Sequence, residues 1–220
     1  MMIENAAIIS ALRTPIAKSF KGAFATIRPD DLGAIVLKEV IKQSKVDPEL
    51  IEDVITGCAM PEAEQGMNVS RIISLRAELP HKVSAATVNR FCASGLHAVA
   101  DIAKSIAVGQ IKVGVGMGVE SMSLVPMGGH KPSANPYLMT NYPQAYTTMG
   151  ITAENVAQKF GIDRQRQDEF ALASHQKALN ALKQAQFAQE IIEVNGIKTD
   201  EGPRADTTLD ALMSLKPAFR

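Results

Sequence analysis

The sequence predicts an α/β protein in which helices cover both faces of a largely parallel sheet. Two observations lead to this fold class. Short segments rich in β-branched and small apolar residues alternate with longer segments whose apolar residues have helical spacing. The composition, 46% hydrophobic and 21% charged over 220 residues, is that of an ordinary globular protein. Alternating strands and helices indicate a layered α/β/α architecture.

Each element can be assigned in order along the first half of the chain. Strands are predicted at 6–16, 54–60, 85–91 and 112–123, and helices at 28–46, 68–79 and 94–109. Asp30 or Asp31 is the expected cap of the first helix. The third helix is expected to turn one apolar face inward, made of Leu96, Val99, Ile102, Ala103 and Ile106.

The character of the chain changes after Ser123. Residues 124–149 contain four prolines and three tyrosines and predict an irregular excursion. Helices are expected near Thr152 and near Asp163, a strand and turn at 190–200, and a last short helix stopped by Pro217. This change divides the chain into two expected domains, 1–123 and 124–220.

Charge and composition exclude several classes of function. The chain has 23 basic and 23 acidic residues, no Trp and 5% aromatics, so no nucleic-acid footprint is visible. No apolar stretch reaches the length of a membrane span, and the amino terminus lacks the basic region of a signal peptide. Two cysteines are too few for a disulfide framework. We expect a soluble, cytoplasmic protein with no metal site, because the histidines show no ligand spacing with the cysteines.

The segment "NRFCASGLHAVADIA" places Cys92 where a strand stops and a helix starts. Free N–H groups and the helix dipole favour a thiolate at such a junction. The small residues that follow leave room for an electrophile, which indicates a nucleophilic cysteine. The alternative is a buried structural cysteine, and that is the expectation for Cys58 in the middle of a strand.

Three further features have simpler interpretations. Gly114, Gly116 and Gly118 spell G-x-G-x-G, but no helix opens there, so close backbone packing is expected rather than a dinucleotide site. His97 lies about one and a half helical turns beyond Cys92 and is expected to face away from it. Glu120 is expected to form hydrogen bonds near the Cys92 turn without a catalytic role.

Several motifs in one order resemble the thiolases, the acyl-CoA acetyltransferases. They are "SALRTPIAKSFKGAFA", "PEAEQGMNVSRIISLRAELP", "NRFCASGLHAVADIA", "GVGMGVESMS", "MGITAENVA" and "TTLDALMSLKPAF". The resemblance implies the thiolase fold, with an amino-terminal domain incomplete at its last strand and an inserted, mostly helical loop domain that covers CoA. It implies that Cys92 attacks a 3-ketoacyl-CoA and carries the acyl group until CoA removes it.

The resemblance also assigns substrate-binding residues. Arg204 matches an arginine near the nucleotide end of CoA, and Met149 matches a residue lining the acyl or pantetheine pocket. Thr148 stands where biosynthetic members often carry histidine, which favours a broad 3-ketoacyl-CoA thiolase over an acetoacetyl-CoA thiolase. Coenzyme A is a substrate, and no cofactor is implied. The partners implied are acyl-CoA thioesters and further copies of the chain, as a dimer or tetramer.

Part of the family's machinery has no counterpart in these 220 residues. The resemblance implies an Asn, a "GHP" histidine and a second catalytic cysteine, none of which occurs here. We therefore expect this chain alone to be inactive, with an exposed sheet edge that associates with itself or with a partner chain supplying the other half. The alternatives are a non-catalytic CoA-binding or assembly chain and a ketoacyl synthase, against which the 124–220 insertion argues.

Overall fold

A computed structural model describes residues 5–219, and the chain forms two compact units. The first unit contains the chain up to residue 131 together with 188–202, and the second contains 132–187 and the residues from 203 onward. The chain therefore passes between the units three times. The expected division into 1–123 and 124–220 as family domains stays a prediction; residues 188–202 pack with the first unit.

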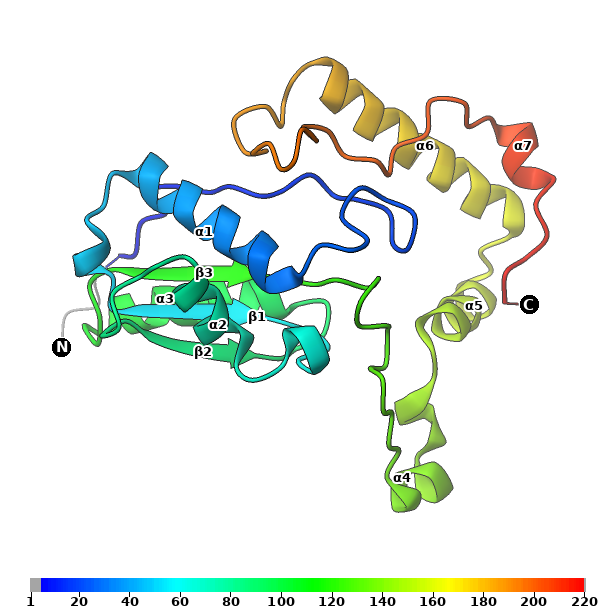
Figure 1. The fold of residues 1–220 in the computed structure, drawn as a ribbon. Coiled ribbons are helices and arrows are strands. Elements are labelled where there is room, and N and C mark those ends of the chain that lie inside the picture. The colour runs from blue at the N-terminus through cyan, green and yellow to red at the C-terminus, as the bar shows by residue number, and fades with distance from the viewer. Residues whose placement is uncertain (1–4, 220) are drawn as a thin grey trace. The chain divides into compact units, whose positions relative to one another are not determined.

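A three-stranded parallel sheet forms the centre of the first unit (Figure 1). Strand β1 (Asp53–Gly57) lies between β2 (Ser84–Val88) and β3 (Gly114–Gly118). Asp53 is opposite Ser84 on one side and Gly114 on the other. The parallel sheet and its strand–helix alternation confirm the predicted α/β class.

Helices pack on both faces of this sheet. Helices α1 (Pro29–Ser44) and α2 (Val69–Arg76) share a buried cluster with Val54 of β1. Helix α3 (Ser94–Ala107) shares another with Ile55, the next residue of the same strand. Successive side chains of a strand point to opposite faces, so one strand supplies both cores. Each fully buried aliphatic side chain contributes about 1.5–3 kcal/mol.

The first predicted strand is the main difference between expectation and structure. In the segment 6–16 only Arg13 makes a β-bridge, to Ile191. Ile8 and Ile9 are 78% and 67% exposed, and β3 pairs with no strand other than β1 among residues 5–219. The segment, β3, α1 and α3 surround a cavity of about 610 Å³. A strand needs a neighbour for its backbone groups, and most of this segment has none.

The cap predicted for the first helix is wrong, and the two later helices begin near their predicted residues. Helix α1 begins at Pro29 after Arg28, and Asp30 lies inside its first turn, where it forms an ion pair with Arg28. Proline needs no N–H partner, so it suits this first position. Thr152 lies within α5 (Met149–Phe160), where its hydroxyl donates to the Thr148 carbonyl. Helix α6 (Arg164–Lys183) begins beside Asp163 as predicted, and the Asp163 carboxylate caps it by accepting from the Arg166 N–H at 2.9 Å.

The second unit is helical, as predicted. Helix α4 (Pro136–Asn141) lies within the excursion, α5 and α6 follow, and α7 (Leu209–Met213) comes last. Arg164 at the start of α6 donates to the carbonyls of Leu212 and Leu215, and its Nε contacts Asp168 at 2.8 Å. One guanidinium thus joins the carboxyl end of α7 to α6. Within residues 5–219, short 3₁₀ turns also occur at Pro48–Leu50 and Ala63–Gln65 in the first unit and at Pro143–Tyr146 in the second.

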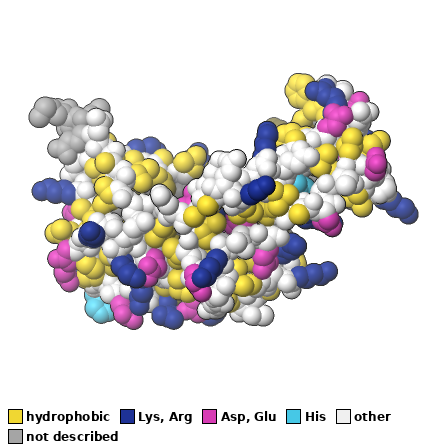
Figure 2. All heavy atoms as spheres, turned by 90° about the horizontal axis from the view of Figure 1, so that it is seen from above, with side chains coloured by type: hydrophobic (Ala, Val, Ile, Leu, Met, Phe, Trp, Pro, Cys, Tyr) yellow, Lys and Arg dark blue, Asp and Glu magenta, His cyan; other side chains and the backbone are white. Residues whose placement is uncertain are grey.

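The surface carries both signs of charge. Figure 2 shows lysine, arginine and acidic side chains interspersed on the face that it presents, in keeping with the net charge of zero. Among the described residues, no helix combines the length and the apolar character needed to cross a bilayer.

Candidate functional site

Cys92 lies on an exposed turn between β2 and α3. The residue before it, Phe91, has φ of 47°, a left-handed conformation that non-glycine residues seldom adopt. Helix α3 begins two residues after the thiol, at Ser94. The sequence therefore placed Cys92 correctly at a strand–helix junction, and exposure excludes the alternative of a buried cysteine.

A network of hydrogen bonds maintains this turn. The Ser94 hydroxyl donates to the Phe91 carbonyl at 2.6 Å and accepts from the Arg90 N–H at 2.8 Å. The Asn89 side chain accepts from the Phe91 N–H and donates to the Ala59 carbonyl at 3.0 Å. These bonds offset the strained φ at Phe91, since such conformations persist only where their surroundings determine them.

Glycines bring α3 close to the sheet beneath Cys92. A Cβ added to Gly57 would lie 2.1 Å from the Ser94 carbonyl carbon. A Cβ on Gly116 would lie 2.5 Å from the Val99 Cα, and one on Gly118 would lie 3.2 Å from the Gly95 Cα. No side chain fits at the first two positions. The glycines of the G-x-G-x-G run thus permit close backbone packing, as predicted.

Glu120, two residues after the end of β3, joins two neighbouring loops. Its carboxylate accepts from the Ala59 N–H at 2.7 Å and from the Gln65 amide at 2.6 Å. Gln65 is fully buried and accepts in turn from the Ser121 N–H. Because Asn89 also contacts Ala59, this network extends to the Cys92 turn. The structure confirms hydrogen bonding by Glu120 near the turn, and it adds Gln65 and Asn89, which lie within quoted motifs but were given no role there.

Cys58 is the second free thiol of the chain and is fully buried. Burial, followed by the nearby Glu120 carboxylate, raises the pKa of Cys58 to about 12. It therefore stays protonated and unreactive at neutral pH, in agreement with the structural role predicted for it.

His97 forms an i,i+4 pair with Asp101 at 3.2 Å.

The two predicted CoA-binding residues belong to the second unit, whereas Cys92 belongs to the first. Met149 is the first residue of α5 and is 61% exposed. Arg204 is exposed, and its backbone N–H donates to His175 Nδ1 at 3.1 Å. Both side chains are available to a ligand, and their roles stay predictions.

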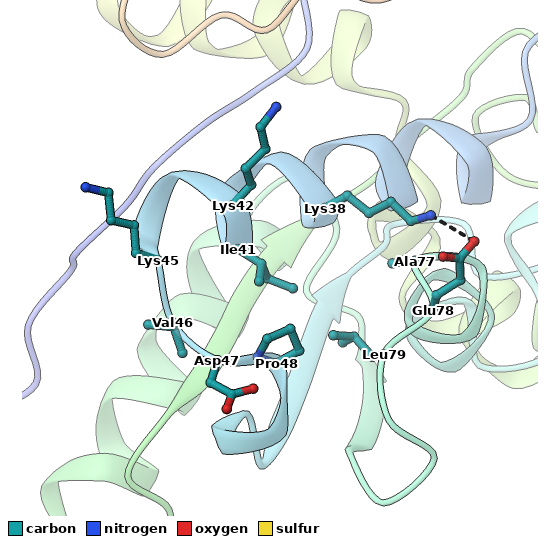
Figure 3. Close-up of a pocket in the computed structure, with 10 residues that line it drawn as sticks. All are labelled: Lys38, Ile41, Lys42, Lys45, Val46, Asp47, Pro48, Ala77, Glu78 and Leu79. Atoms are coloured by element: carbon teal, nitrogen blue, oxygen red, sulfur yellow. Dashed lines mark ion pairs between the residues drawn. The ribbon is translucent and has the colours of Figure 1, made fainter.

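Two hollows of the first unit do not include Cys92 in their lining. One is the cavity beside β3 described above. The other, of about 520 Å³, lies at the carboxyl end of α1. Figure 3 shows apolar Ile41, Val46 and Leu79 within it, and Lys38 on its rim directed toward Glu78, with which it forms a 3.0 Å ion pair. Among residues 5–219, no cluster of three or more His, Cys, Asp or Glu side chains has the arrangement of a metal site.

The fold and the cysteine turn define the class of protein. Residues 6–220 match the family described as "Thiolase, N-terminal domain". The chain therefore belongs to the thiolase family, and the resemblance read from its motifs is confirmed.

Individual relatives agree with this assignment. The chain is 45% identical to a 3-ketoacyl-CoA thiolase of Bacillus subtilis, over 99% of this chain and 60% of the relative. It is 40% identical to a 3-ketoacyl-CoA thiolase of Erwinia tasmaniensis, over 99% and 58% of the two chains. The crystal structure of the Bacillus anthracis acetyl-CoA acetyltransferase superimposes with a TM-score of 0.85 at 33% identity, covering all of this chain and 60% of the other. This chain thus spans about 60% of the length of such relatives.

Proposed function

We propose that this chain is the nucleophile-bearing part of a thiolase that cleaves 3-ketoacyl-CoA with CoA or runs the reverse condensation. The observation that carries the proposal is the exposed Cys92 at the amino end of α3. Its turn is held by side-chain hydrogen bonds from Ser94 and Asn89. A nucleophile needs an accessible thiol in a fixed position, and a merely structural cysteine needs neither.

The proposed reaction forms and breaks one bond in each step. The Cys92 sulfur attacks the keto carbon C3, and the carbonyl electrons move to oxygen. Their return breaks the C2–C3 bond, and the electron pair on C2 leaves as the enolate of acetyl-CoA, which takes up a proton. The CoA thiol loses its proton and attacks the thioester on Cys92; the bond between the acyl carbon and the Cys92 sulfur breaks, which restores the Cys92 thiolate and releases the shortened acyl-CoA. The resemblance implies that the proton at C2 is handled by residues without a counterpart in this chain.

Arg204 and Met149 are proposed to contact CoA. The Arg204 side chain is 61% exposed and forms a loose ion pair with Asp206, at 3.6 Å from Nε to Oδ1. A planar cation of this kind suits a phosphate. Met149 presents an exposed apolar side chain at the start of α5. It suits the pantetheine or acyl chain.

The substrate class is proposed to be broad 3-ketoacyl-CoA. Two relatives named above are 3-ketoacyl-CoA thiolases, and Thr148 replaces the histidine expected of biosynthetic members. The alternative is an acetoacetyl-CoA thiolase, the class nearest in name to the acetyl-CoA acetyltransferase of the matching crystal structure. Comparing acetoacetyl-CoA with longer 3-ketoacyl-CoA substrates in the enzyme that contains this chain would separate the two.

Intact-mass measurement tests the nucleophile directly. The chain is incubated with acetyl-CoA, and a single added acetyl group on Cys92 is expected. The Cys92→Ser variant should lose it, while the matched Cys58→Ala variant should keep it, because that thiol is buried. Acetylation that persists in Cys92→Ser, or none in the wild type even when the carboxy-terminal half expected of the family is added as a second chain, would refute the proposal.

A further inference from the structure

One arginine contacts both ends of the segment 188–202. Arg13 Nε lies 2.7 Å from Glu190, and its two terminal nitrogens lie 2.8 and 3.0 Å from the two carboxylate oxygens of Asp200. The side chain of Asp200 is only 14% exposed and that of Arg13 30% exposed. We call Arg13, Glu190 and Asp200 the clasp. Bidentate guanidinium–carboxylate pairs of this kind have a defined geometry and are stronger than single contacts.

Backbone hydrogen bonds reinforce the clasp at both ends. The Arg13 N–H donates to the Glu190 carbonyl at 2.8 Å, and the Arg13 carbonyl accepts from the Ile192 N–H at 3.0 Å. At the other end, Asp200 Oδ1 also accepts from the Ile16 N–H at 2.8 Å. The Arg13 hydrogen bond lowers the pKa of Asp200, so this carboxylate remains charged at neutral pH.

Glu201 extends the same contact to the next loop. Its carboxylate accepts from the N–H groups of Lys18 and Ala23, both at 2.9 Å. Its own N–H donates to the Ile16 carbonyl at 2.9 Å. Asp200 and Glu201, adjacent in sequence, thus attach the end of the segment to the loop that follows Arg13.

The position of this segment in the chain gives the clasp its significance. Residues 188–202 belong to the first unit, and the chain enters the second unit directly on either side of them. Glu190 lies close after one passage and Asp200 close before the other. Two of the three covalent connections to the second unit therefore start from backbone that Arg13 holds.

We propose that Arg13 is a positioning residue that fixes the anchorage of the second unit and thereby sets the affinity for CoA without taking part in the chemistry at Cys92. The CoA half of this statement rests on the proposed function, because it requires that the second unit bind CoA. The anchorage half rests on the contacts alone. Loss of the clasp frees the backbone from which two of the connections start, so a smaller fraction of molecules is competent to bind.

Kinetics of Cys92 acetylation separate affinity from chemistry. In Arg13→Gln, we expect the acetyl-CoA concentration that gives the half-maximal rate to rise about tenfold, while the maximal rate stays unchanged. A tenfold rise corresponds to a tenfold smaller fraction of molecules that are competent to bind. In Arg13→Lys this concentration should rise less, because lysine keeps the positive charge but cannot form the bidentate pair of a guanidinium. Arg28→Gln is the matched control, since it breaks another arginine–aspartate pair, with Asp30, outside the segment. A lower maximal rate with unchanged half-saturation would overturn the proposal.

A distance measurement tests the anchorage without CoA. Nitroxide labels on Lys104→Cys and Lys177→Cys, one in each unit, are placed in a Cys92→Ser background, and their separation is measured by pulsed electron resonance. Arg13→Gln should widen the distance distribution, and Arg28→Gln should leave it unchanged. An unchanged distribution in Arg13→Gln refutes the anchorage. If Cys92 of the wild type is not acetylated, the proposed function fails. The distance measurement still decides whether Arg13 anchors the second unit.

Discussion

Replacing Gly57 by alanine is expected to separate α3 from β1 and to displace the Cys92 turn. Gly57 is the last residue of β1, and its missing side chain leaves room for the first turn of α3. An added Cβ would lie 2.1 Å from the Ser94 carbonyl carbon, 2.3 Å from its oxygen and 2.4 Å from the Gly95 nitrogen. All three neighbours are backbone atoms, so no side-chain rotation relieves the contact.

The size of the effect follows from these distances. An ordinary contact begins at 3.4 Å, so the helix and the strand must move apart by about 1.3 Å, the difference from 2.1 Å. Overpacking a core costs typically about 1–3 kcal/mol, and a clash with backbone alone belongs at the upper end. For a chain of this length, 3 kcal/mol lowers the melting temperature by roughly 6–12 °C.

Denaturant unfolding and Cys92 acetylation together measure this prediction. Gly57→Ala should lower the unfolding midpoint and slow acetylation, because the Ser94 and Phe91 contacts move with the helix. Gly95→Ala is the matched control on the same helix, where an added Cβ would meet only the Gly118 Cα at 3.7 Å. It should be neutral or slightly stabilising. Equal midpoints for Gly57→Ala and the wild type would refute the close-packing argument.

Three further predictions concern charge, helix anchoring and association. The pKa of Cys58 is raised to about 12 in the folded chain, so as the pH rises above about 9 the unfolded chain loses the thiol proton first. The free energy of unfolding should therefore fall by up to about 1.4 kcal/mol per pH unit in that range. Denaturant titrations at pH 8 and 10 should show this fall in the wild type and not in Cys58→Ala. Arg164→Ala leaves the buried Asp168 unpaired and frees the end of α7, so it should cost about 2 kcal/mol, whereas an unfolding midpoint equal to that of the wild type would argue against the anchoring role. One edge of β3 pairs with no strand in the described part of the chain, and Ile8 and Ile9 are exposed, so the 220-residue chain should associate; a strictly monomeric mass by light scattering would contradict this.

Much of the fold could be predicted because local patterns and the tertiary structure agree. Strand β3 and helices α2 and α3 lie within their predicted ranges, whereas β1 and β2 each begin one residue before theirs. Leu96 was wrongly assigned to the buried face of α3 and is 76% exposed, while Ala98 is fully buried. Periodicity predicts a helix, but it does not say which part of the helix meets the sheet. At the start of α3 the close approach of glycine backbones buries the small residue instead of the large one.

The site was predictable only in part. Cys92 could be found because its junction has a signature in adjacent residues, namely an apolar strand, a thiol and small residues that open a helix. Asn89, Gln65 and Glu120 are separated along the chain, and only folding joins them into the network beside Ala59. Hydrogen bonds between residues distant in sequence leave no periodic signal.

By itself, the sequence determined the alternation of strands and helices, the parallel sheet and the position of Cys92, because each depends on side-chain pattern over a few neighbouring residues. Only the tertiary structure decided that residues 6–16 form a single β-bridge instead of a strand, and that Arg13 contacts both ends of 188–202. Strand pairing and ion pairs between segments depend on which backbones and charges meet in space, and a one-dimensional pattern does not contain that information.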